Sequence, residues 1–192
     1  MPMPRSATTV ANARAASANA GSNPGTDPAF AAGARDLATT LAERGIGVVY
    51  GGASAGLMGL LADTVLEHGG EVVGVIPRVL VDREVAHRGL TELHVVESMH
   101  ERKAKMAELS DAFIALPGGI GTLEELVEVY TWSYLGIHDK PLGLVNTDGY
   151  YDGLTAFLDH SVTEGFLRPQ TRASLNVAPD GPSLLAGWLP GR

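Results

Sequence analysis

The chain contains no cysteine and only three lysines, Lys103, Lys105 and Lys140. The absence of cysteine excludes a disulfide, a thiol nucleophile and a cysteine-ligated metal. None of the six histidines stands at metal-ligand spacing from another, so we predict no metal site and no cofactor. The formal net charge is −8 and there is no run of basic residues, which argues against nonspecific binding to nucleic acid or to an anionic membrane surface.

Long apolar stretches are also missing. No segment is long and apolar enough to span a bilayer, and the N-terminus lacks the apolar core of a secretory signal. We therefore expect a cytoplasmic protein. With 192 residues, 45% of them hydrophobic, the chain is long enough for one domain with a substantial core.

The first twenty residues are mainly Ala, Ser, Thr, Asn and Pro, with few large aliphatic side chains. This composition predicts a weakly ordered arm over residues 1–20, followed by a single domain over residues 21–192.

Apolar runs alternate with helical patterns over the rest of the chain. Strands are predicted at 47–50, 71–76, 92–96, 112–116 and 140–145, and helices at 28–44, 60–68, 98–110, 123–135, 152–164 and 184–189. The strands are continuous apolar runs, which is typical of a parallel sheet covered by helices on both faces. Ligands of such sheets bind beyond the C-terminal ends of the strands.

The most informative segment is Pro117–Glu125, a glycine-rich turn between an apolar strand and a helix. Its glycines allow backbone N–H groups to approach a ligand, and the start of the helix favours a phosphate or another anion. A structural alternative is a capping box, with Thr122 as N-cap and Glu125 folding back onto its N–H. The turn by itself does not decide between the two.

A second glycine-rich turn, Gly51–Gly59, follows the strand that ends at Tyr50. It lacks both the strict dinucleotide fingerprint and a Walker A lysine, so it is either a tight connection or part of a nucleotide site. Ser54 lies within it, in a pattern that a serine hydrolase could also use, although no Asp or His partner can be assigned.

Arg102 stands on the apolar side of its predicted helix, with Met99, Met106 and Leu109. A buried guanidinium needs a partner or a ligand, and its geometry suits phosphate or carboxylate. The alternative is that its head reaches solvent at the end of the helix.

Pro117–Glu125, Gly52–Gly59 and Met99–Lys103 together resemble the Lonely Guy (LOG) family of cytokinin riboside 5′-monophosphate phosphoribohydrolases, long labelled lysine decarboxylases. The motif Pro-Gly-Gly-x-Gly-Thr-x-x-Glu is present without a gap, and the similarity extends from about residue 21 to about residue 169. The resemblance implies a Rossmann-like three-layer α/β/α fold with a mostly parallel sheet. It also implies a homodimer or higher homo-oligomer, and hydrolysis of N6-substituted AMP to a free base and ribose 5-phosphate.

The resemblance also implies site residues. It places the catalytic pair at Arg102 and Glu125. The residues expected to bind the nucleotide are Ser22, Gly52, Met58, Glu84, Arg102, Lys103, Gly118, Gly119, Ile120, Gly121, Thr122, Leu123 and Glu124. The main alternative is a non-catalytic protein that binds purine nucleotides on the same fold.

One segment departs from the family pattern. Ala15–Ala20 stands where the family has an apolar first strand leading into Gly21-Ser22, and alanine and asparagine are poor strand formers. The first strand is therefore expected to be weak, or missing, or supplied differently.

Overall fold

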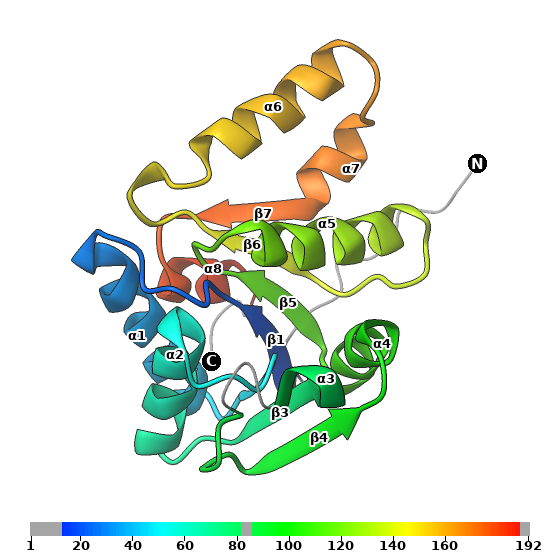
Figure 1. Cartoon of the computed structure of the whole chain (residues 1–192). Coiled ribbons are helices and arrows are strands. Elements are labelled where there is room, and N and C mark those ends of the chain that lie inside the picture. Colours follow the sequence, from blue (N-terminus) through cyan, green and yellow to red (C-terminus); the bar gives the residue numbers. More distant parts are fainter. Residues whose placement is uncertain (1–12, 82–85, 189–192) are drawn as a thin grey trace.

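A computed structural model describes residues 13–81 and 86–188 (Figure 1). The described residues form one seven-stranded sheet in which every pair of neighbouring strands is parallel. The strands are β1 (Ala15–Asn19), β2 (Gly47–Tyr50), β3 (Val72–Pro77), β4 (Glu92–Val96), β5 (Ala112–Ala115), β6 (Leu142–Val145) and β7 (Leu175–Ala178). The helices are α1 (Pro28–Glu43), α2 (Gly56–Glu67), α3 (Arg78–Val81), α4 (Met99–Leu109), α5 (Ile120–Tyr134), α6 (Asp152–Thr163), α7 (Pro169–Ser174) and α8 (Gly181–Trp188).

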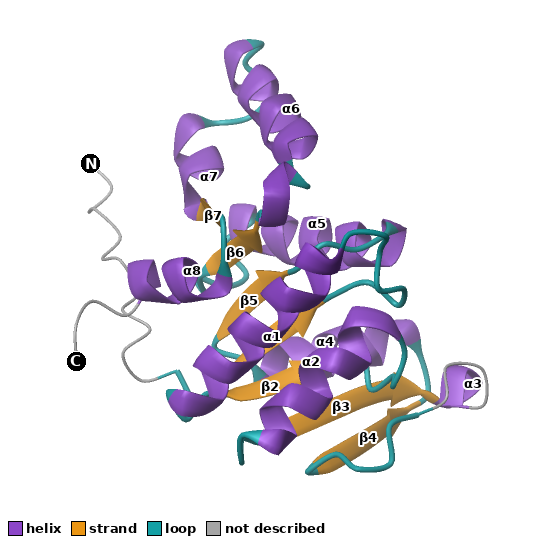
Figure 2. Cartoon of the chain, turned by 90° about the vertical axis from the view of Figure 1, so that its left-hand side faces the viewer, coloured by secondary structure: helices purple, strands orange, loops and turns teal. Residues whose placement is uncertain are grey.

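Helices cover both faces of the sheet, which confirms the predicted three-layer α/β/α class. Helices α1, α2 and α8 pack on one face through a core that includes Leu37, Leu61 and Leu185. Helices α4 and α5 pack on the opposite face through Met106, Leu126 and Val129 (Figure 2). Within the described part of the chain, no helix is long and apolar enough to cross a bilayer.

The strand order is β4-β3-β2-β1-β5-β6-β7. Strands β2 to β4 therefore lie on one side of β1, and strands β5 to β7 lie on the other. The loops that follow β1 and β5 diverge at this point, where parallel sheets bind ligands. The Gly21 N–H donates to the Pro117 carbonyl at 3.1 Å, which joins the two loops.

The expected arm over residues 1–20 is wrong for its second part. Ala15–Asn19 is strand β1, paired with β2 on one side and β5 on the other. It forms a strand although alanine and asparagine have low β propensity. The carboxylate of Asp111 accepts from the N–H groups of Arg14 and Ala15 at 2.7 and 3.2 Å and holds the start of the strand. Burial between two strands therefore overrides local propensity, and the domain begins before residue 21. Residues 1–12 of the expected arm lie outside the described residues.

The helix of the Pro117–Glu125 motif starts earlier than predicted. Helix α5 begins at Ile120, with Gly119 as its N-cap, and no side chain of the described residues caps it. Thr122 is a helical residue, so the alternative of a capping box at Thr122 and Glu125 is wrong. Helix α4 begins with part of a capping box: Ser98 Oγ accepts from the Glu101 N–H at 3.1 Å, but the Glu101 carboxylate accepts from the Glu97 N–H rather than from that of Ser98.

Candidate active site

The glycine-rich loop after β5 leaves the start of α5 open to a ligand. Ile120 is 84% exposed, and a Cβ placed at Gly119 or Gly121 would meet no atom within 4 Å. The first N–H groups of α5 point toward this open end and carry the positive end of the helix dipole. An anion such as a phosphate can therefore bind there through the backbone.

Close packing around Gly118 holds the same loop in place. A Cβ at Gly118 would lie 2.1 Å from Thr122 Oγ1 and 2.8 Å from the Gly21 nitrogen, so only glycine fits at this position. The Tyr150 hydroxyl donates to the Gly118 carbonyl at 2.6 Å. The loop is thus held in one conformation by the β1 loop on one side and by Tyr150 on the other.

A cavity of about 240 Å³ lies beside this loop. It is lined by residues of the loops that follow β1 and β5 and by two aromatic residues. Among them are Gly21, Ser22, Gly118, Gly119, Phe30 and Tyr150. The rings of Phe30 and Tyr150 meet edge to face at 5.5 Å. Ser22, Gly118 and Gly119 were predicted from the sequence, whereas no role was predicted for Phe30 or Tyr150. Both residues lie within the stretch of family resemblance, about residues 21–169, which by itself indicates no function for either.

Arg102 is buried rather than directed to solvent, so the prediction of a partner is confirmed and the alternative of a solvent-exposed head is wrong. The residue is 6% exposed, and its Nη2 lies 3.8 Å from Glu125 Oε1. Its Nε has no hydrogen-bond partner among the described residues, and Nη1 donates to Met99 Sδ, a weak acceptor, at 3.8 Å. A guanidinium with so few strong partners has donors left for an anionic ligand.

The end of β2 makes room for this guanidinium. A Cβ at Gly51 would lie 2.0 Å from Arg102 Nη2 and 3.7 Å from Met58 Sδ. The N–H groups of Leu57 and Met58 donate to the Gly21 carbonyl at 3.0 and 3.3 Å. The second glycine-rich turn is therefore packed against both Arg102 and the β1 loop, which brings Met58 into the same region.

Burial raises the pKa of the Glu125 carboxyl group above its usual value. The neighbouring Arg102 and Lys103 oppose this shift, whereas Glu124 and Glu128 add to it. A carboxyl group with a raised pKa, paired with a buried arginine, is a common arrangement in sites that move protons or stabilise positive charge.

Lys103 forms ion pairs with Glu124 and Glu128. Lys103 Nζ lies 2.7 Å from Glu124 Oε1 and 2.9 Å from Glu128 Oε1. The hydrogen bond to Glu124 is the main reason that the pKa of Lys103 is raised. Both residues were expected to bind the nucleotide, but neither lines the 240 Å³ cavity, and they lie beside Glu125 instead.

Glu84, another expected nucleotide contact, lies outside the described residues. The chain directly after that segment is next to the second glycine-rich turn: Ala86 forms a bridge with Ala53, and the His87 N–H donates to the Gly52 carbonyl at 2.9 Å. The predicted residue Gly52 is thus joined to this stretch of chain.

His87 has hydrogen-bond partners at both ring nitrogens. Its Nε2 lies 2.8 Å from Asp63 Oδ1, and its Nδ1 accepts from the Gly89 N–H at 3.1 Å. Both ring nitrogens are therefore occupied, and this histidine cannot act as the base of a serine hydrolase without breaking one of these contacts.

The chain is similar to known proteins over most of its length. Residues 58–187 match a family model described as "Possible lysine decarboxylase". The chain is 53% identical over 165 residues to the probable cytokinin riboside 5′-monophosphate phosphoribohydrolase LOGL1 of Oryza sativa subsp. japonica, covering 86% of this chain and 74% of the relative. It is 50% identical to the corresponding enzyme LOG1 of Arabidopsis thaliana, covering 86% and 78%.

Among solved structures, the molybdenum cofactor carrier protein of Chlamydomonas reinhardtii matches with a TM-score of 0.67 over 90% of this chain and 94% of that one. At 21% identity, this likeness shows the shared fold alone. The identity to these relatives and the match to the family model show that the chain belongs to the LOG family of cytokinin riboside 5′-monophosphate phosphoribohydrolases.

Proposed function

We propose that the protein hydrolyses the N-glycosidic bond of N6-substituted AMP, that is, of cytokinin riboside 5′-monophosphates, and releases the free base and ribose 5-phosphate. The observation that carries this proposal is the buried Arg102–Glu125 pair next to the uncapped start of α5. The names of relatives that are 50 to 53% identical support the same reaction.

In this proposal the 5′-phosphate binds at the N-terminus of α5, at the backbone of Gly119, Ile120 and Gly121. Ser22 and Gly118 form the rest of the phosphate-binding site, beside the start of α5. Phosphate binding holds the ribose in one place, so that its anomeric carbon is held at a defined distance from the buried pair.

The N-glycosidic bond then breaks through a transition state with positive charge on the sugar. The Glu125 carboxylate stabilises this charge and takes a proton from the attacking water. Arg102 orients Glu125 and the nucleotide. Such acid–base assistance contributes a factor of about 10²–10⁴ to a rate.

The direct test is the release of free base and ribose 5-phosphate from N6-isopentenyl-AMP, followed by chromatography. The non-catalytic alternative predicts binding of the same nucleotide, measured by calorimetry, with both products absent. A decarboxylase would need a Schiff-base lysine, but Lys103 pairs with two glutamates, Lys105 with Glu108, and Lys140 donates to a backbone carbonyl.

The pH dependence of this reaction follows from the raised pKa of Glu125. The carboxylate is the active form, so kcat/KM should fall as the pH falls through a pKa above the usual value of about 4.3 for glutamate. We expect the acidic limb of the kcat/KM profile to lie at higher pH than the ordinary titration of a glutamate, because burial raises the pKa of Glu125. A limb at or below the ordinary glutamate pKa would contradict the assignment of Glu125 as the base.

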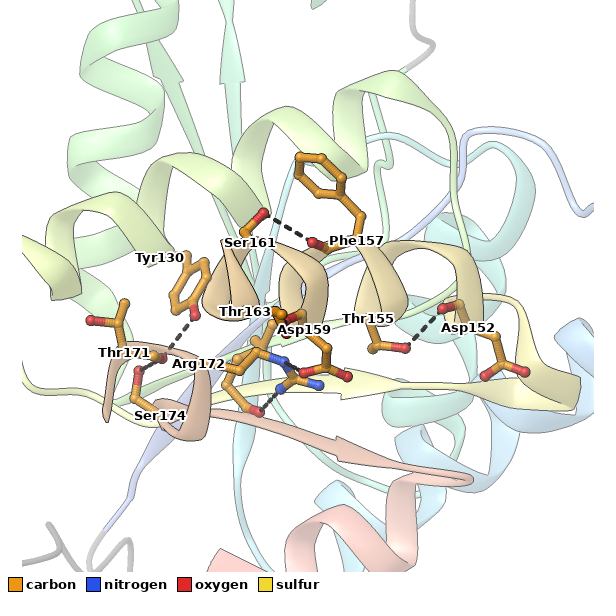
Figure 3. A network of polar contacts seen from close by, with 11 residues as sticks. Tyr130, Asp152, Thr155, Phe157, Asp159, Ser161, Thr163, Thr171, Arg172 and Ser174 are labelled. Atoms are coloured by element: carbon orange, nitrogen blue, oxygen red, sulfur yellow. Dashed lines mark hydrogen bonds and ion pairs between the residues drawn. The ribbon is translucent and has the colours of Figure 1, made fainter. Parts of the chain in front are cut away.

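We also propose that the protein works as a homodimer in the cytoplasm. Helix α6, all of which the structure describes, has no buried residue of its own, and Phe157 is 63% exposed on it. Figure 3 shows the Phe157 ring on the side of α6 opposite Asp159, which pairs with Arg172 of α7 at 2.7 Å. Phe166, which follows α6, is 90% exposed. Apolar side chains this exposed are typical of an interface between subunits.

Phe157→Glu should therefore shift the protein from twice the chain mass to the mass of one chain in light scattering coupled to size-exclusion chromatography. The reason is that a carboxylate cannot be buried in an apolar interface without a partner. Val79→Glu is the matched control, because Val79 is also 63% exposed but lies on α3, beside the opposite edge of the sheet. A dimer that survives Phe157→Glu, or one that Val79→Glu dissociates, would place the interface elsewhere.

A further inference from the structure

A small chamber lies behind Glu125, on the side of the sheet covered by α4 and α5. Its volume is about 20 Å³, and its walls include Ser17, Asn19, Lys103, Phe113, Glu125 and Glu128. A space of about 10–15 Å³ is sufficient for one water molecule when polar partners are present. The chamber is separate from the 240 Å³ cavity, with which it shares no lining residue.

The composition of β1 explains why this space exists. Successive residues of a strand point to opposite faces, so Ser17 and Asn19 share one face while Ala16 and Ala18 pack in the core with α1 and α2. The face toward α4 and α5 therefore carries two short polar side chains at the centre of the sheet. Larger apolar residues would fill the gap between the two helices, whereas these leave it open.

Two hydrogen-bond acceptors on the walls have no partner among the described residues: Asn19 Oδ1 and Glu128 Oε2. Asn19 is 6% exposed, and the other oxygen of Glu128 already accepts from Lys103 at 2.9 Å. Buried acceptors of this kind are normally satisfied. One water molecule has two O–H donors, which is the number that these two acceptors require.

We propose that the chamber holds one ordered water molecule that donates to Asn19 and Glu128 and accepts a hydrogen bond from the carboxyl group of Glu125. Asn19 and Glu128 are then positioning residues that act on Glu125 through this water. The role in catalysis, though not the water site itself, rests on the hydrolysis proposed above.

The arrangement gives the proton of Glu125 a route out of the site. Glu125 in its acid form passes its proton to the water, and the water passes one of its own protons to the Glu128 carboxylate. Glu125 becomes a carboxylate, Glu128 becomes the acid, and the water is regenerated. Lys103 connects Glu128 to Glu124, which is half exposed, so the path reaches the surface.

The water also favours the acid form of Glu125, because its two hydrogens are committed and only its lone pairs face that carboxyl group. The charged groups around Glu125 come from two elements. These are Arg102 and Lys103 on α4, and Glu124 and Glu128 on α5; the residues that β1 and β5 contribute to the chamber walls, Ser17, Asn19 and Phe113, are uncharged.

Titration of Glu125 by NMR tests this without relying on turnover. With ¹³Cδ-labelled glutamate, the Glu125 signal is assigned by its loss in Glu125→Gln. Glu128→Gln removes a negative charge and replaces an acceptor with an amide that can donate, which turns the water toward Glu125 as a donor. We expect it to lower the pKa of Glu125 by about one unit.

Glu124→Gln is the matched comparison, because through charge alone Glu124 raises the pKa of Glu125 more than Glu128 does. The water predicts the larger shift for Glu128→Gln; an equal or larger shift for Glu124→Gln would overturn the proposal. A high-resolution crystal structure should show the water within hydrogen-bond distance of Asn19 Oδ1 and Glu128 Oε2, and an empty chamber would also overturn it. Neither measurement uses substrate, so failure of the water site and failure of the hydrolysis can be told apart.

Discussion

Glu125→Gln should abolish the release of base while leaving nucleotide binding nearly intact. The substitution keeps the size of the side chain but removes the negative charge that stabilises the sugar cation and the group that accepts the proton of water. We expect kcat for N6-isopentenyl-AMP to fall by a factor of about 10²–10⁴ or more. The affinity for the nucleotide, measured by calorimetry, should change by less than about threefold, because the phosphate is bound by the backbone at the start of α5.

The structure makes this experiment more decisive than the sequence did. From the motif, Glu125 could have been a capping residue, and its loss could have weakened the helix. Because α5 begins at Ile120 with Gly119 as its N-cap, Glu125 lies one turn inside the helix and has no capping role. Glu108→Gln on α4 is a suitable control, since Glu108 is exposed and paired only with Lys105 in the described structure. Turnover of Glu125→Gln close to that of the wild type would remove Glu125 from the mechanism.

Most of the fold could be predicted because its core strands are apolar runs bounded by glycine or proline. Val48, Val49 and Tyr50 form β2 as expected, and Asp27 and Pro28 start α1 as N-cap and first helical residue. In these segments the local pattern and the tertiary environment agree.

The segments that could not be predicted are those that depend on their neighbours. Strand β1 consists of Ala, Ser and Asn and is a strand because β2 and β5 bind both its edges. Strand β7 and the short helix α7 were also missed: β7 is at the edge of the sheet, paired only with β6, and only its first residue, Leu175, is buried. An edge strand of four residues carries too few apolar positions to form a clear pattern.

The candidate site was predictable in its motif but not in its contacts. The spacing of Arg102 on its helix indicated a buried charge, and the structure pairs it with Glu125. The hydrogen bond from Tyr150 to Gly118 joins residues 32 positions apart, and no local pattern reveals a pairing across that distance. The chamber at Asn19 likewise depends on how α4 and α5 lie over β1, which the sequence does not encode locally.

Arg102 gives the second large effect. Arg102→Leu removes the cation nearest to Glu125, and leaving a buried charge without its partner typically costs about 3–5 kcal/mol. Because Arg102 lowers the pKa of Glu125, its removal should raise that pKa further. The free variant then keeps a proton on Glu125 to a higher pH than the wild type does, so the acidic limb of kcat/KM should move to higher pH. We expect kcat/KM at pH 7 to fall by a factor of about 10² or more.

Arg102→Lys separates charge from shape at the same position. Lysine keeps the positive charge but lacks the planar fork that fills the space beside Gly51, where Nη2 lies 2.0 Å from the position of a Cβ. If Arg102 acts by charge alone, Arg102→Lys should keep the pH profile of the wild type and most of its kcat/KM. If the guanidinium also binds the nucleotide, as its few strong contacts within the protein imply, Arg102→Lys should have the pH profile of the wild type but a KM about tenfold higher. An acidic limb that moves to lower pH in Arg102→Leu would contradict the pairing with Glu125 itself.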